Sequence, residues 1–112
     1  MKVKKQYIWL FGIILLAGIL SFFLLSSANV KVFFIGEKAS YQHDRGHYDR
    51  AIQSYEKLIE LDPKTGSNYW NLAVAYLQKG DKVHATKQIV RLRSIGEDDL
   101  AVMLKDFIKR NE

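Results

Sequence analysis

A 34-residue repeat is the feature of this sequence that most limits how the chain can fold. Within Gly46 to Pro63, three residues recur unchanged 34 positions later: Gly46 as Gly80, Ala51 as Ala85, and Leu58 as Leu92. At two further positions one apolar residue replaces another: Ile89 for Tyr55, and Ile95 for Leu61. A fixed period of this length is typical of an array of helical hairpins. Because each hairpin has an apolar face that it cannot bury alone, successive hairpins stack on one another.

The second copy carries the fuller motif. Its first helix has Tyr69, Leu72-Ala73 and Tyr76 at helical spacing, and residues 71–80 read NLAVAYLQKG. In this stretch the chain resembles the tetratricopeptide repeat (TPR) family. The second-helix signature is carried by Ala51, Tyr55 and Pro63 in the first copy and by Ala85 and Ile89 in the second, with Glu97 replacing the closing proline. The first copy departs at its start, where Ile35, Lys38 and Gln42 replace Tyr69, Leu72 and Tyr76.

The resemblance covers residues 33–97 and implies an all-α fold that binds other proteins. In TPRs the first helix of each pair lines an inner face, and the residues expected there in this chain are Trp70, Asn71, Val74, Leu77 and Gln78. Aromatic anchors are enriched at protein interfaces, so Trp70 is the residue expected to contact a partner.

A long apolar segment precedes the repeats. No charged residue occurs from Gln6 to Val30, and Tyr7 to Leu25 is largely apolar. As a helix these nineteen residues span about 28 Å, close to the roughly 30 Å of a bilayer's hydrocarbon core. The segment therefore predicts a transmembrane helix, with Tyr7 and Trp9 at its entry edge.

Charge predicts the orientation of this helix. Lys2, Lys4 and Lys5 precede the span, whereas only Lys31 and Lys38 follow it closely. By the positive-inside rule the N-terminus is cytoplasmic. We therefore expect a single-pass protein of the bacterial inner membrane with its repeats on the extracytoplasmic side.

Two alternatives concern the same segment. Ser26-Ser27-Ala28 would serve as a signal-peptidase site, although the apolar run exceeds the 7–15 residues of a typical signal peptide. Small residues that favour close helix packing, or simply reflect ordinary membrane-helix composition, are Gly12, Ala17, Gly18 and Ser21. A homo-oligomer formed through the membrane helix is thus a second structural hypothesis.

The sequence predicts the following organisation: a basic N-terminus at 1–6, a membrane helix at 7–28, a linker at 29–32, two repeats at 33–65 and 66–97, and a capping helix at 98–112. Within the repeats, helices are expected at 32–45, 48–61, 67–79, 82–94 and 98–110, with Gly46, Pro63, Gly80 and Gly96 at their ends.

Local details of these helices are also predicted. Ser67 and Asp98 are the expected N-caps of the third and fifth helices. Apolar stripes place Val83 of the fourth helix, and Met103 and Phe107 of the capping helix, inside the core. The stripe of the capping helix would alternatively bind a partner, but we expect it to cover the second repeat. Phe33, Phe34 and Ile35 have two interpretations, packing inside the first repeat or inserting at the lipid headgroups, and we expect the first.

The sequence offers little chemistry for a catalytic or cofactor site. There is no cysteine, and His43 and His47 are separated by an expected helix break at Gly46, so they are expected to be loop or solvated histidines. No phosphate-binding or nucleophile motif is present. The net charge of +5 falls to +2 after residue 5, which does not indicate nucleic-acid binding. We expect a non-enzyme without cofactors that scaffolds a larger membrane complex, or assists the assembly or quality control of membrane or exported proteins.

Overall fold

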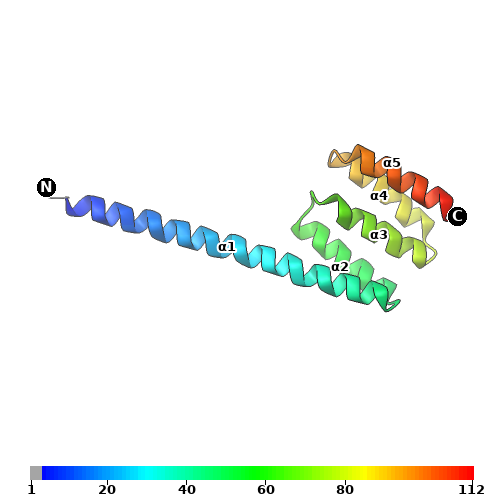
Figure 1. Cartoon of the computed structure of the whole chain (residues 1–112), viewed down its shortest axis with the longest axis horizontal. Coiled ribbons are helices and arrows are strands. Elements are labelled where there is room, and N and C mark those ends of the chain that lie inside the picture. The colour runs from blue at the N-terminus through cyan, green and yellow to red at the C-terminus, as the bar shows by residue number, and fades with distance from the viewer. Residues whose placement is uncertain (1–3) are drawn as a thin grey trace. The chain divides into compact units, whose positions relative to one another are not determined.

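The computed structural model describes residues 4–112 and confirms the expected all-α fold over that range. Its helices are α1 (Lys5–Asp44), α2 (Tyr48–Leu61), α3 (Gly66–Gln78), α4 (Lys82–Ser94) and α5 (Asp98–Arg110), as Figure 1 shows. Lys2, which belongs to the expected basic N-terminus, lies outside the described residues.

The chain divides into two compact units, Met1–Lys31 and Val32–Glu112, and α1 contributes residues to both. Residues 29–32, predicted as a linker, are helical within α1. The physical reason is that residues 26–32 contain neither the proline nor the glycine that would interrupt a helix.

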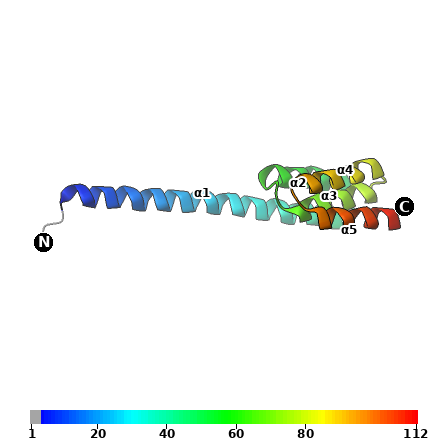
Figure 2. The same cartoon turned by 90° about the horizontal axis from the view of Figure 1, so that it is seen from above.

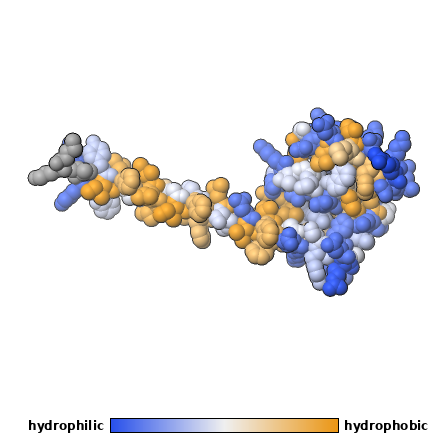
Figure 3. All heavy atoms as spheres, viewed as in Figure 1, coloured by the Kyte–Doolittle hydropathy of each residue, from blue (hydrophilic) through white to orange (hydrophobic). Residues whose placement is uncertain are grey.

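The first unit is an apolar helix with exposed side chains. None of the most apolar stretch of α1 is buried. Figure 3 shows this apolar surface along the helix. The helix is long and apolar enough to cross a membrane, and a signal sequence would satisfy the same criteria of length and composition.

The second unit is built in two layers. Figure 2 shows α2 and α4 on one side of this unit and α3 and α5 on the other. Along the chain, α3 packs between α2 and α4, and α4 packs against α5. Alternation between two layers is the arrangement expected for stacked helical hairpins.

Three helix ends share one hydrogen-bond pattern. At the end of α3, the Gly80 N–H donates to the Leu77 carbonyl at 2.9 Å and the Asp81 N–H donates to the Tyr76 carbonyl at 2.8 Å. This is a Schellman motif, and it requires the left-handed conformation that Gly80 adopts at φ +87°. The same pair of bonds recurs where α1 and α4 end, at Gly46 and Gly96. The predicted glycine helix ends are therefore confirmed.

The connection between the repeats is fixed differently. Pro63 follows the end of α2, and its carbonyl accepts a 2.6 Å hydrogen bond from the Tyr69 hydroxyl on α3. Thr65 donates its side-chain hydroxyl to the Asp62 carboxylate at 2.5 Å. These bonds hold the start of α3 close to the end of α2.

Two predicted N-caps are wrong by one or two residues. Thr65, rather than Ser67, occupies the N-cap of α3, because the helix already begins at Gly66. Glu97, rather than Asp98, occupies the N-cap of α5, because the Glu97 N–H completes the Schellman turn at the end of α4 and the helix starts at the next residue.

The core is formed by small residues where helices approach closely and by leucines between them. Fully buried alanines come from all five helices: Ala39, Ala51, Ala73, Ala75, Ala85 and Ala101. Leu72, Leu92 and Leu104 are the largest fully buried side chains, one each from α3, α4 and α5. Ala39 and Ala73 lie 34 residues apart, so the repeat period is preserved in the core even where the motif is weak.

Four apolar residues predicted to face inward are exposed instead. Val83 is 67% exposed, because the buried face of α4 runs through Ala85, Ile89 and Leu92. Met103 is 59% exposed, because Leu104 takes the core position beside it.

The other two residues are Phe33 and Phe34, which are 62% and 65% exposed. Their neighbours Val32 and Ile35 pack against the core in their place. The expected inward packing of Phe33 and Phe34 is therefore wrong.

Polar contacts join the repeats across their outer faces. Arg91 on α4 donates two hydrogen bonds to the Glu56 carboxylate on α2, at 3.0 and 3.2 Å, and its guanidinium lies 5.0 Å from the centre of the Tyr69 ring. Lys79 forms a further ion pair with Asp49 at 2.5 Å. Both ion pairs join a residue of the second repeat to one on α2.

Candidate interaction pocket

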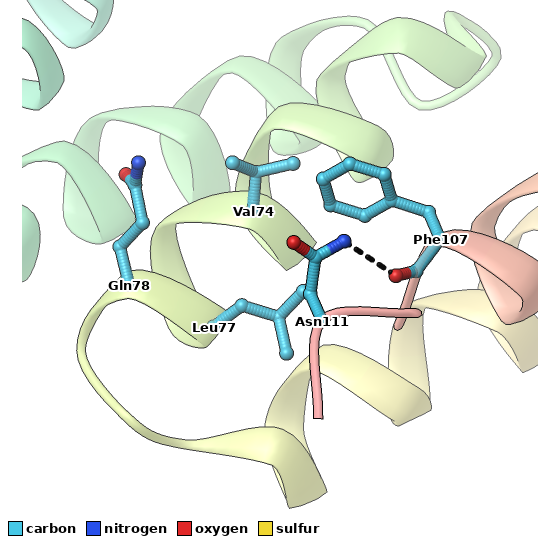
Figure 4. Close-up of a pocket in the computed structure, with 5 residues that line it drawn as sticks. All are labelled: Val74, Leu77, Gln78, Phe107 and Asn111. Carbon is cyan, nitrogen blue, oxygen red and sulfur yellow. Dashed lines mark hydrogen bonds between the residues drawn. The ribbon is translucent and has the colours of Figure 1, made fainter. Parts of the chain in front are cut away.

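A pocket lies between α3 and the C-terminal end of α5. It has a volume of about 230 Å³ and is lined by Val74, Leu77, Gln78, Phe107 and Asn111; we call it the α3–α5 pocket (Figure 4). Three lining side chains are apolar and two are neutral amides. The pocket is smaller than the roughly 300–1,000 Å³ of typical small-molecule sites, so its size suits a side chain better than a metabolite.

The first-helix face predicted from the sequence is only partly gathered in this pocket. Val74, Leu77 and Gln78 line it, whereas Trp70 and Asn71 do not. Trp70 is partly buried, and its ring centre lies 5.3 Å from that of Phe107. Trp70 therefore supports one wall of the pocket by packing against Phe107, which lines it.

The second wall comes from α5. Phe107 lies in the last turn and a half of α5, and Asn111 follows the helix end, where its side-chain N–H donates to the Phe107 carbonyl at 2.8 Å. Figure 4 shows this bond beside Val74 and Leu77. The capping helix thus contributes lining residues as well as covering the core.

His43, in the last turn of α1, contacts side chains of both α2 and α3. Its Nε2 meets the Gln78 side-chain oxygen, and its Nδ1 lies 3.4 Å from the Tyr55 hydroxyl. The ring is also edge-on to Tyr48, with centres 5.7 Å apart. His43 is therefore a partly buried residue that links α1, α2 and α3, rather than the loop or solvated histidine expected.

The ring nitrogens of His43 already have protein partners, and His47 lies beyond the Gly46 turn. This arrangement does not form a chelating pair.

The electrostatics around the pocket are mild. None of its five lining residues carries a charge. Behind the His43 contact, burial raises the pKa of the Tyr55 phenol, with the Asp44 carboxylate adding to the effect and a Ser40 hydrogen bond opposing it. Tyr55 therefore stays neutral at physiological pH.

Two lining residues and one supporting residue were not predicted as part of the inner face. Phe107 was assigned to the inward stripe of the capping helix, and Asn111 and His43 were given no role there. Phe107 could have been found from the sequence, because a helix that continues the array faces α3. The pairing of His43 with Gln78 spans 35 residues and has no local signal.

Comparison with known proteins identifies a repeat of a known family in part of the chain. Residues 42–80 match the family model described as a TPR repeat. The chain therefore contains a TPR repeat in this segment. The matched segment includes α2 and all of α3, which ends at the pocket residue Gln78. No solved structure gives a significant match to the chain.

A TPR is a module for binding other proteins rather than a catalytic unit. The pocket agrees with this role, because its apolar wall and two amides resemble the core and rim of a protein contact. The chain therefore carries a protein-interaction module.

The small residues in the apolar part of α1 remain a prediction as a packing face. Gly12 lies in a shallow recess with Ile8, Trp9, Ile13 and Leu16 around it. A side chain added at Gly12 or Gly18 would meet nothing within 4 Å in this structure. A stripe of small residues does not by itself define a partner.

Proposed function

We propose that this TPR protein is anchored in a membrane and holds a segment of another protein, as a small scaffold or accessory subunit of a membrane complex. The observation that carries the proposal is the α3–α5 pocket, an uncharged recess about 230 Å³ in volume on the second repeat.

The pocket chemistry suits one apolar side chain on a peptide. Val74, Leu77 and Phe107 supply an apolar wall. Gln78 accepts a bond from His43 through its oxygen, which leaves its amide N–H₂ as a donor for a peptide carbonyl. Asn111 donates to Phe107, which leaves its side-chain oxygen as an acceptor for a peptide N–H.

Membrane anchoring is supported by the exposed apolar part of α1. Exposing this much apolar surface to water is unfavourable, whereas lipid would cover it at little cost. The balance of lysines around the segment favours a cytoplasmic N-terminus and extracytoplasmic repeats.

The test is recovery of partners by the tagged full-length protein from its native membrane. Asn111→Trp is expected to fill the pocket and reduce partner recovery, because Asn111 lines the pocket and is itself exposed. Met103→Trp adds the same side chain at an exposed position of α5 that does not line the pocket, and it is the matched control. Equal recovery by both variants and the parent would contradict the pocket as the binding site.

Trp70→Ala is a weaker test on its own. It would remove the contact with Phe107 that supports the pocket wall, so it changes packing as well as any partner contact. We expect it to lower both thermal stability and partner recovery.

Native-gel mass spectrometry after detergent extraction separates the remaining alternatives. Co-migration at fixed stoichiometry supports an accessory subunit, whereas mixed partners below stoichiometric amounts support an assembly or quality-control factor. Self-association through the membrane helix predicts that cross-linked oligomers disappear when residues 1–30 are removed.

A further inference from the structure

Phe33 and Phe34 form an exposed aromatic pair at the start of the second unit. Their ring centres are 5.8 Å apart in an edge-to-face arrangement, and both side chains are more than 60% exposed. Val32 and Ile35, on either side, pack against the core. Two adjacent exposed phenylalanines cost hydration free energy, which favours an environment that covers them.

The position of the pair in α1 indicates which environment that is. Trp9 and Phe33 are 24 residues apart, and α1 is helical throughout Lys5–Asp44. A helix of that length rises about 36 Å, which lies between the roughly 30 Å hydrocarbon core and the 40–45 Å bilayer that includes the headgroups. Tryptophan is enriched at membrane interfaces, and phenylalanine side chains of interfacial helices bury at the boundary of headgroups and acyl chains, so this separation fits the two interfaces of one bilayer.

Charges near the pair agree with this placement. Lys31 follows the uncharged stretch that ends at Val30, and a lysine there reaches the headgroups along its aliphatic stem. The first acidic residue of the chain is Glu37, followed directly by Lys38. The first acidic side chain therefore lies about one helical turn beyond Phe33.

We propose that Phe33 and Phe34 insert into the lipid headgroup region and form the second interfacial anchor of the membrane helix, opposite Tyr7 and Trp9. This inference rests on the membrane anchoring proposed above. The surface is an interaction site for lipid rather than protein, because the pair continues directly from a segment whose length already matches a bilayer.

Absence of cysteine from the sequence makes a direct depth measurement practical. The full-length protein is reconstituted in vesicles of phosphatidylcholine and phosphatidylglycerol with one nitroxide label, placed at Phe34→Cys, Leu16→Cys or Gln53→Cys. Collision rates with oxygen and with a water-soluble nickel chelate are then measured. Leu16 lies in the apolar stretch and serves as the hydrocarbon reference, and exposed Gln53 on α2 serves as the water reference.

A label at Phe34→Cys is expected to show intermediate depth. Its collisions with the nickel chelate fall below those of Gln53→Cys, and its collisions with oxygen fall below those of Leu16→Cys. Nickel accessibility equal to that of Gln53→Cys would overturn the inference while a protected Leu16→Cys left the membrane anchor intact. Protection of Phe34→Cys from both reagents would overturn it in favour of a protein contact. A water-accessible Leu16→Cys would remove the anchor and the inference together.

A second variant checks that the pair has no structural role. Phe33→Ser with Phe34→Ser is expected to leave the thermal unfolding of the TPR unit unchanged, because both side chains lie outside the core. With a label at Val30→Cys, the same double substitution is expected to raise collisions with the nickel chelate. An unchanged collision rate would contradict an anchoring role.

Discussion

Arg91 joins three helices through one side chain. It donates two hydrogen bonds to Glu56 on α2 and lies over the Tyr69 ring of α3. Both charged side chains are a little over a third exposed, so solvent screens much of their attraction. We expect a double-mutant cycle with Arg91→Met and Glu56→Gln to give a coupling of about 0.5–1 kcal/mol in urea unfolding.

The control for this prediction is Lys57 with Glu60. This pair also lies at the surface, at 3.4 Å, but it is more exposed and joins residues of one helix. Its coupling is expected to be about 0.3 kcal/mol or less. Arg91→Lys should lose most of the larger coupling, because a lysine has no planar fork to hold both Glu56 oxygens. Equal couplings for the two pairs would contradict the prediction.

Asp81 gives the start of α4 a dependence on pH. Its carboxylate accepts a 3.0 Å hydrogen bond from the His84 backbone N–H, which is the main cause that lowers the Asp81 pKa below its usual 3.8. Contact with the His84 ring lowers it further, and partial burial opposes both. A carboxyl with a lowered pKa stabilises the fold above its unfolded pKa, and that contribution is lost as pH falls through the folded value.

Asp81→Asn isolates this effect, because the amide oxygen still accepts from the His84 N–H but does not titrate. The stability advantage of the parent over Asp81→Asn is expected to shrink as pH falls from about 5 towards 2. The measurement is urea unfolding followed by circular dichroism at each pH. An advantage that stayed constant over this range would rule out the carboxylate as its source.

At the scale of elements, α5 completes the core of the second repeat. Leu104 is fully buried while its neighbour Met103 is 59% exposed, so the two provide a matched comparison on one helix. Leu104→Ala is expected to lower the free energy of unfolding by about 2–4 kcal/mol through lost burial and a cavity. Met103→Ala should change it by less than about 0.5 kcal/mol. Similar losses for both variants would mean that the buried face of α5 has been assigned wrongly.

Helix boundaries were predictable because the signals that set them are local. At Gly46, Gly80 and Gly96 the glycine N–H donates to the carbonyl three residues earlier, and the N–H of the next residue donates to the carbonyl five residues before itself. Pro63 cannot continue α2. Helix faces were less predictable near the ends. Val83 is in the first turn of α4, where an apolar residue extends the apparent stripe without having a neighbouring helix to pack against.

The pocket was only half predictable, for a different reason. Its α3 wall follows from the repeat register, which fixes the direction of Val74 and Leu77 once Tyr69 and Leu72 are in the core. The α5 wall depends on how far the capping helix reaches, and the support from His43 depends on a contact over 35 residues. Such long-range contacts arise from packing and leave no periodic trace in the sequence.

At the scale of the molecule, the size of the TPR unit limits its stability. The unit spans Val32–Glu112 and has one core formed by two repeats and the capping helix. Arrays of this type usually need three repeats, because each repeat buries its apolar face on a neighbour. Because the unit is small, it also buries a lower share of its surface on folding than a larger domain would. A partner, a second copy or the membrane surface is therefore expected to add stability.

This expectation can be measured on residues 32–112 produced without the apolar segment. We expect a free energy of unfolding of about 5 kcal/mol or less in urea, since a core of this size rarely provides more. Adding a peptide that contains the partner segment should raise the unfolding midpoint, because a ligand that binds only the folded state stabilises it by mass action. The Asn111→Trp variant should show a smaller rise, since its pocket is filled. A free energy above about 10 kcal/mol for the isolated monomer would instead mean that α5 alone replaces the missing third repeat, and that binding serves recognition without completing the fold.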